Sequence, residues 1–153
     1  MEYVIRKGTD SDLVQVMQLV KDLAEFEKAP EAVTNTVERM RQERQHFDFF
    51  VATDGDEIVG MALYFFAYYT WVGKSLYLDD LFVKPEHRGN KIASKLLKEV
   101  FKVAQDQNCQ RVRWQVLDWN QGAIDVYKKL GADLDAEWIN CNFLPEQFAD
   151  LAN

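Results

Sequence analysis

The chain has 153 residues, a length typical of one domain, so we expect a single domain over residues 1–153. Its composition is 48% hydrophobic and 28% charged, which excludes a disordered, collagen-like or low-complexity chain. The formal net charge of −7 argues against binding to nucleic acid or to an anionic membrane surface. This acidity fits a dissolved cytosolic protein and an enzyme with a cationic substrate equally well.

The first third of the chain predicts one strand and two helices. Residues 3–7 are typical of a strand, and Asp10 or Ser11 is placed to cap a helix whose apolar residues recur at helical spacing. Pro30 ends that helix, and residues 34–45 predict a second, more polar one.

Three β-rich segments follow. Residues 47–53 and 57–69 flank a turn with Gly55 at its centre and predict a hairpin. Residues 75–83 predict a third strand, which runs into the loop 84–90.

The last part predicts a helix lined by apolar residues from Ile92 to Ala104, a strand at 111–117 and a helix at 121–130. Gly131 stands where a left-handed helix cap belongs, and residues 138–144 predict a last strand. This order of elements implies an α/β (α+β) chain with a mixed sheet and helices packed on its faces.

The isolated cysteines Cys109 and Cys141 and the isolated His46 and His87 lack the grouping of a zinc site, so we expect no metal. The longest apolar stretch, residues 58–69, is far shorter than the roughly 20 residues of a membrane-spanning helix. Because no signal peptide is visible either, we expect a cytoplasmic protein without a membrane partner.

The loop His87-Arg88-Gly89-Asn90 joins a strand directly to a helix. The unpaired N–H groups and positive dipole at such a helix start suit a pyrophosphate, and Arg88 and Lys91 add positive charge. An ordinary strand-to-helix turn is the alternative interpretation. The loop is neither a Walker loop nor a dinucleotide Gly-x-Gly-x-x-Gly.

Arg88-Gly89-Asn90-Lys91-Ile92-Ala93 resembles the acetyl-coenzyme A loop of the GNAT N-acetyltransferases, Gln/Arg-x-x-Gly-x-Gly/Ala. Further segments are similar to the diamine branch, which contains the spermidine/spermine and thialysine acetyltransferases. They lie at residues 23–28, 76–83, 116–121 and 127–132. The resemblance runs from Tyr3 to about Asp135 and implies a mostly antiparallel central sheet with helices on both faces.

The resemblance implies acetyl-CoA as co-substrate, bound by the third strand, the loop and the region after the next strand. The implied cofactor-binding residues are Leu81, Phe82, Val83, Arg88, Gly89, Asn90, Lys91, Ile92, Ala93, Ser94, Asn120 and Tyr127. Lys91 replaces a family glycine, so either its backbone keeps a negative φ or the pyrophosphate sits differently. Without the resemblance, residues 81–83 are core strand and Asn120 is a helix N-cap.

Acetyl transfer to a primary amine requires removal of a proton, because the pKa of such an amine is about 10.4. Asp79 matches the family's substrate carboxylate, usually Glu in this branch, and is the expected catalytic residue that binds the ammonium or accepts its proton, directly or through water. Strand alternation predicts that Asp79 and Asp80 face opposite ways. Tyr127 matches the tyrosine that protonates the leaving thiolate. The alternatives are a solvated strand end for Asp79 and a packed aromatic for Tyr127.

The implied substrate is a small cationic amine, either a diamine or polyamine or a thialysine-like amino acid. The residues expected to bind it are Phe26, Glu27, Glu31, Asp79 and Glu137. The branch also implies a homodimer. Two other functions compete with this one: a degenerate CoA-binding regulatory domain, and a protein-lysine or N-terminal acetyltransferase.

Overall fold

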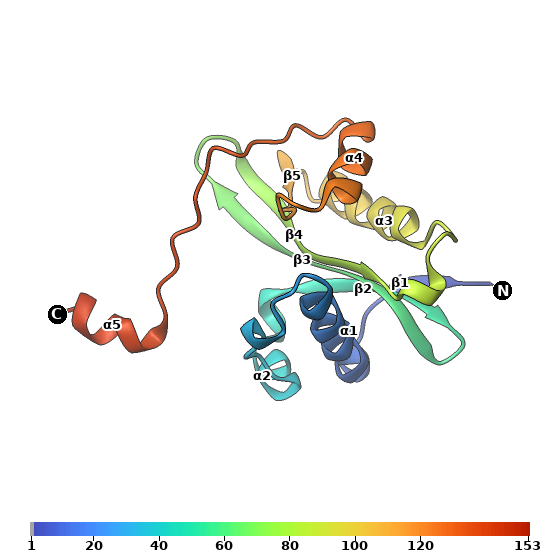
Figure 1. Ribbon diagram of the computed structural model, residues 1–153, viewed down its shortest axis with the longest axis horizontal. Coiled ribbons are helices and arrows are strands. Elements are labelled where there is room, and N and C mark those ends of the chain that lie inside the picture. The colour runs from blue at the N-terminus through green and yellow to red at the C-terminus, as the bar shows by residue number, and fades with distance from the viewer. Residues whose placement is uncertain (1) are drawn as a thin grey trace. The chain divides into compact units, whose positions relative to one another are not determined.

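The computed structural model describes residues 2–153 (Figure 1). The chain divides into two compact units, Met1–Gln115 and Val116–Asn153. In the part of the chain described, none of the helices is long and apolar enough to cross a membrane.

The first unit is built on a five-stranded sheet. Its elements are β1 (Val4–Lys7), α1 (Leu13–Phe26), α2 (Val37–Gln42), β2 (Asp48–Asp54), β3 (Glu57–Tyr69), β4 (Gly73–Val83), α3 (Ile92–Asp106) and β5 (Arg111–Arg113). The strands lie in the order β1-β2-β3-β4-β5. All neighbours pair antiparallel except β4 and β5, which are parallel and joined through α3. The predicted mixed, mostly antiparallel sheet is confirmed.

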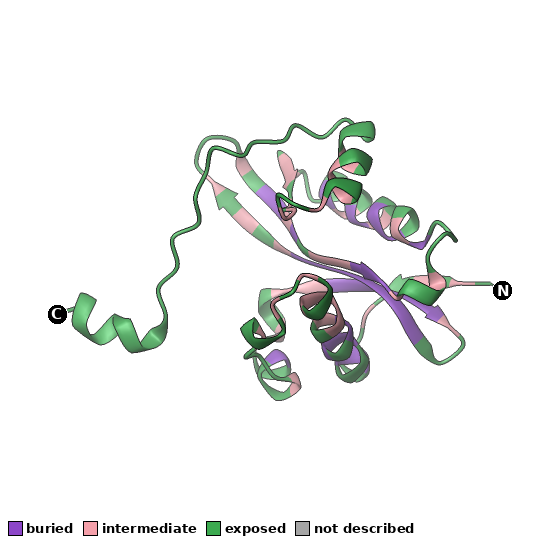
Figure 2. Ribbon diagram, in the orientation of Figure 1, coloured by how far each residue is buried: buried purple, intermediate pink, exposed green. Residues whose placement is uncertain are grey.

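Helices cover both faces of this sheet, also as predicted (Figure 2). Leu96 and Val100 of α3 are fully buried against one face, together with Leu76 of β4. Val16 of α1 and Met40 of α2 are buried against the other face. The two apolar layers enclose the central strands and hold β4 between helices on either side, which fixes the position of its carboxyl end.

Two elements are shorter than predicted. The Thr36 hydroxyl accepts a hydrogen bond of 3.1 Å from the Arg39 N–H, so α2 begins at Val37 rather than at residue 34. α2 ends at Gln42, and Arg44–His46 forms a separate 3-10 turn. The predicted strand 111–117 pairs with β4 only over its first three residues.

The second unit contains α4 (Gln121–Lys129) and α5 (Pro145–Leu151). Gly131 has a φ of 92°, which confirms the left-handed cap. The strand predicted at residues 138–144 is wrong, because these residues are exposed and pair with no strand of the described chain. Their apolar pattern does not suffice, since a strand also needs a partner for its backbone hydrogen bonds. α5 was not predicted, although Pro145 suits a first helical position.

Candidate active site

A β-bulge interrupts β4 at its two aspartates. Asp80 lies opposite Leu63 of β3, whereas Leu78 lies opposite the next residue, Tyr64, so Asp79 is left without a partner in the ladder. The regular alternation that we predicted for Asp79 and Asp80 is therefore broken at this point. Bulges re-aim side chains, and this one lies where β4 passes the end of α1.

Three carboxyl groups influence one another at this bulge. Burial raises the pKa of Asp79, and burial together with Asp79 raises the pKa of Glu27, the residue that follows α1. Burial raises the pKa of Asp80 to about 7, with Asp79 and Glu27 as further causes. Like charges held close together in a partly buried site disfavour ionisation, and a bound cation relieves this penalty.

Glu27, Asp79 and Asp80 form a carboxylate cluster that takes part in none of the ion pairs of the described residues. Over the same residues, no group of His, Cys, Asp or Glu side chains is arranged to hold a metal ion. The cluster therefore has the charge and the unused acceptor oxygens to bind an ammonium group.

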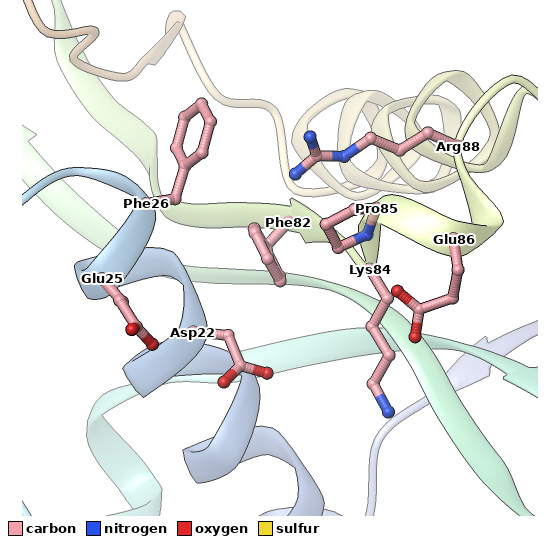
Figure 3. A pocket seen from close by; sticks show the side chains of 8 residues that line it. All are labelled: Asp22, Glu25, Phe26, Phe82, Lys84, Pro85, Glu86 and Arg88. Carbon is pink, nitrogen blue, oxygen red and sulfur yellow. The ribbon is translucent and has the colours of Figure 1, made fainter.

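A groove of about 400 Å³ lies beside β4 (Figure 3). Its lining residues are Asp22, Glu25, Phe26, Phe82, Lys84, Pro85, Glu86 and Arg88. The Arg88 guanidinium carbon lies 5.5 Å from the ring centres of both Phe26 and Phe82. The structure thus brings the predicted substrate residue Phe26 together with the predicted cofactor residues Phe82 and Arg88.

The carboxyl end of β4 has one edge that β5 does not cover. Residues 81–83 pair with residues 60–62 of β3 on one side, whereas β5 pairs with β4 only at Ser75, Leu76 and Tyr77. The Val83 carbonyl accepts a 3.0 Å hydrogen bond from Arg88 Nε. An extended ligand can add to such a strand edge through backbone hydrogen bonds.

The loop before α3 has two residues in left-handed conformation. Gly89 has a φ of 84°, and Lys91, the N-cap of α3, has a φ of 62°. Of the two alternatives for Lys91, a backbone with negative φ is excluded, and a different seat of the pyrophosphate stays a prediction. The Asn90 side chain donates a 2.9 Å hydrogen bond to the His87 carbonyl and closes the loop. Ile92 packs in the core, whereas Arg88, Lys91 and Ser94 are exposed.

Four further predicted residues belong to other segments of the sequence. Glu31 is exposed in the 3-10 turn Pro30–Ala32. Asn120 caps α4 in the second unit by accepting from the Ala123 N–H, Tyr127 is half-buried on the same helix, and Glu137 is exposed. Their roles at the site stay predictions.

Sequence reasoning missed several residues of the groove. Asp22 and Glu25 of α1 line it beside Phe26, and Lys84 and Glu86 line it from the loop. The spacing of Asp22, Glu25 and Phe26 along one helical face was the available signal. This spacing indicates that the three side chains lie on one side of α1, but it does not indicate which part of the protein that side faces.

The sequence pattern of the Acetyltransferase (GNAT) family matches residues 13–132. The chain is 40% identical to the thialysine N-epsilon-acetyltransferase of Sus scrofa, over 97% of this chain and 96% of that one. It is 30% identical to a spermidine/spermine N(1)-acetyltransferase-like protein of Homo sapiens, over 99% of this chain and 24% of that protein. An integron cassette protein from V. cholerae shares the fold, with a TM-score of 0.78, 23% identity and coverage of 99% and 98%.

Proposed function

Because the chain belongs to the GNAT acetyltransferase family, we propose that it transfers the acetyl group of acetyl-CoA to a primary amine of a small cationic substrate. The observation that carries this proposal is the cluster of unpaired carboxylates at the β4 bulge, Glu27, Asp79 and Asp80. The similarity to a thialysine acetyltransferase favours a thialysine-like amino acid as substrate, with polyamines second.

The proposed reaction is direct attack on the thioester. The substrate enters as an ammonium bound by Asp79, and a carboxylate of the cluster accepts its proton. Asp79 is the predicted acceptor and Asp80 the second candidate, because burial raises the pKa of both carboxyl groups, that of Asp80 to about 7. The amine nitrogen then attacks the thioester carbonyl, so that a C–N bond forms and the C–S bond breaks. Tyr127 protonates the departing thiolate, and the second proton that the nitrogen loses as the amide forms restores the Tyr127 phenol.

The residues around β4 fit acetyl-CoA in two respects. The uncovered edge of residues 81–83 can pair with an extended pantetheine arm. Exposed Arg88 and Lys91 stand at the start of α3, where a helix dipole favours phosphate. We extend the proposal to the whole chain, residues 1–153, acting as one cytoplasmic catalytic domain without a metal.

Release of free thiol from acetyl-CoA, measured against a panel of amines, tests this function. The panel contains thialysine, lysine, spermidine, putrescine and a lysine peptide. Saturable turnover of a small amine is the expected result. Turnover of the peptide alone would identify a protein acetyltransferase. No turnover with any amine, together with no binding of coenzyme A in calorimetry, would favour a regulatory domain.

Replacing Tyr127 with Phe tests the general acid. We expect kcat to fall by about 10²- to 10⁴-fold, because the thiolate then leaves without a proton. The matched control is Tyr64→Phe, which removes a hydroxyl from a buried tyrosine of β3 outside the proposed site. Unchanged kcat in Tyr127→Phe would remove this residue from the mechanism.

A further inference from the structure

Two arginines of β5 stack on one aromatic ring. The guanidinium carbons of Arg111 and Arg113 lie 4.6 and 4.8 Å from the ring centre of Tyr69. Since they are two residues apart on a strand, both side chains project from the same face of the sheet. The structure therefore concentrates two positive charges in a chain whose net charge is −7.

This arginine pair, Arg111 and Arg113, has no anionic partner within the described residues. None of the ion pairs of residues 2–153 includes either arginine. The Nε of Arg111 is buried and has no hydrogen-bond acceptor, the one such side-chain atom in the described chain. A buried donor left unsatisfied is costly, so an acceptor from outside the chain would stabilise this site.

Tyr77 links the arginine pair to the carboxylate cluster. It pairs with Arg113 across the β4–β5 ladder and stacks on Phe65 at 5.1 Å. Burial is the main cause that raises the pKa of Tyr77, and Asp79 and Asp80 raise it further, whereas Arg113 lowers it. The phenol is thus within electrostatic reach of both the acidic and the basic group.

The separation of the two groups suits an amino acid. Asp79 and Asp80 lie two and three residues beyond Tyr77, the ladder partner of Arg113, which corresponds to roughly 7–10 Å along a regular strand. Arg111 lies opposite Ser75, two residues further from the carboxylates. In an extended lysine-like amino acid the side-chain nitrogen and the α-carboxylate carbon are also roughly 7 Å apart, from standard bond lengths. One such molecule can place its ammonium at the carboxylates and its carboxylate at the arginines.

We propose that Arg111 and Arg113 bind the α-carboxylate of an amino-acid substrate whose side-chain amine is held by Glu27, Asp79 and Asp80. This inference rests on the proposed function and names its substrate class. The planar guanidinium presents paired donors that match the two oxygens of a carboxylate. A diamine has no group for this position, so the arginine pair selects amino acids over diamines.

The test compares kcat/KM for thialysine, for its carboxamide and for its decarboxylated diamine. The three molecules share the reacting amine and differ at the carboxylate. In wild-type enzyme we expect thialysine to be the preferred substrate. In Arg113→Gln and Arg111→Gln we expect kcat/KM for thialysine to fall about 10- to 100-fold, with little change for the other two.

Lys74→Gln is the matched control. Lys74 is a cation of β4, the strand beside β5. Its Nζ lies 4.7 Å from the ring centre of Phe66 and donates a hydrogen bond to Gln107, the residue that follows α3. Its removal subtracts the same charge without touching the proposed site. We expect the ratio of thialysine to diamine turnover to stay at the wild-type value.

Two outcomes would overturn the inference while leaving the proposed function intact. One is a wild-type enzyme that prefers the diamine, and the other is an equal loss for all three substrates in the arginine variants. If wild-type enzyme acetylates no amine, the proposed function fails. Calorimetry then tests whether the arginine pair binds a carboxylate. Equal affinity of wild-type protein for thialysine and its carboxamide would reject this role. A loss of thialysine binding in Arg113→Gln, with carboxamide binding unchanged, would support it.

Discussion

Lys91 holds a backbone conformation that a lysine adopts only at a cost. Its φ of 62° and ψ of 21° place it in the left-handed region, where the Cβ of an L-residue is strained. The loop before α3 nevertheless needs this conformation at the N-cap. The surrounding contacts, including the hydrogen bond from Asn90 to the His87 carbonyl, hold it in place.

We predict that Lys91→Gly raises the free energy of unfolding by about 0.5–1 kcal/mol, because glycine adopts this conformation without strain. Chemical denaturation measures the change. Asn108→Gly is the matched control at another left-handed residue, with a φ of 55°, and it should gain less because asparagine tolerates this region. If the Lys91 ammonium also contacts the pyrophosphate, KM for acetyl-CoA rises in the glycine variant. A loss of stability would contradict the strain argument.

Asp80 makes stability depend on pH. Its pKa is about 7 in the folded protein and about 3.9 when unfolded, so the folded state binds more protons between these values. The free energy of unfolding therefore falls as the pH rises from about 4 through about 7. Asp80→Asn removes this dependence and should be more stable than wild type by roughly 1–3 kcal/mol at about pH 8, with little difference at about pH 4. An equal difference at both pH values would contradict the assignment.

At the scale of elements, α4 depends on Asn120. Its side-chain oxygen accepts from the Ala123 N–H and satisfies one of the free donors at the helix start. The resemblance assigns the same side chain to the pantetheine arm, so a single substitution by Ala would remove both roles together.

Asn120→Ser separates the two roles. Serine is about as good an N-cap as asparagine, so we expect the free energy of unfolding to stay near wild type, whereas Asn120→Ala should lose about 1 kcal/mol. If the amide also binds pantetheine, KM for acetyl-CoA rises in both variants. Thermal unfolding and initial rates at varied acetyl-CoA measure the two effects. An unchanged KM in Asn120→Ser would restrict Asn120 to capping.

At the scale of the whole molecule, exposed aromatic side chains gather where β3 turns into β4. Tyr68 is 76% and Trp71 is 85% exposed, and Phe66 beside them is 44% exposed. Such exposure at adjacent positions is typical of a contact surface. The resemblance to the diamine branch implies a homodimer, so we expect a second copy of this chain to cover this surface.

We therefore expect a homodimer at micromolar concentration in sedimentation velocity. Tyr68→Glu should convert it to a monomer, because a carboxylate would be buried without a partner in the contact. The control is Val14→Glu on the exposed side of α1, which adds the same charge away from this surface. A wild-type monomer would contradict the expectation.

The sequence by itself determined most of the elements. β3 was predicted with the bounds that the structure has, Glu57–Tyr69, and Gly131 was predicted as a left-handed cap. These features depend on side chains near in sequence, on the period of apolar residues and on the φ angles that glycine permits. The motif around Arg88 likewise indicated the family, since it lies in one continuous segment.

Only the tertiary structure decided which charges meet. The bulge at Asp79 depends on the register between β3 and β4, and the effect of Asp79 on Glu27 depends on α1 ending beside β4. The arginine pair at Tyr69 joins β5 to the end of β3. Strand register and helix docking are set by packing between distant segments, which the period of a sequence does not encode. For the same reason residues 138–144 have a strand-like pattern and form no strand.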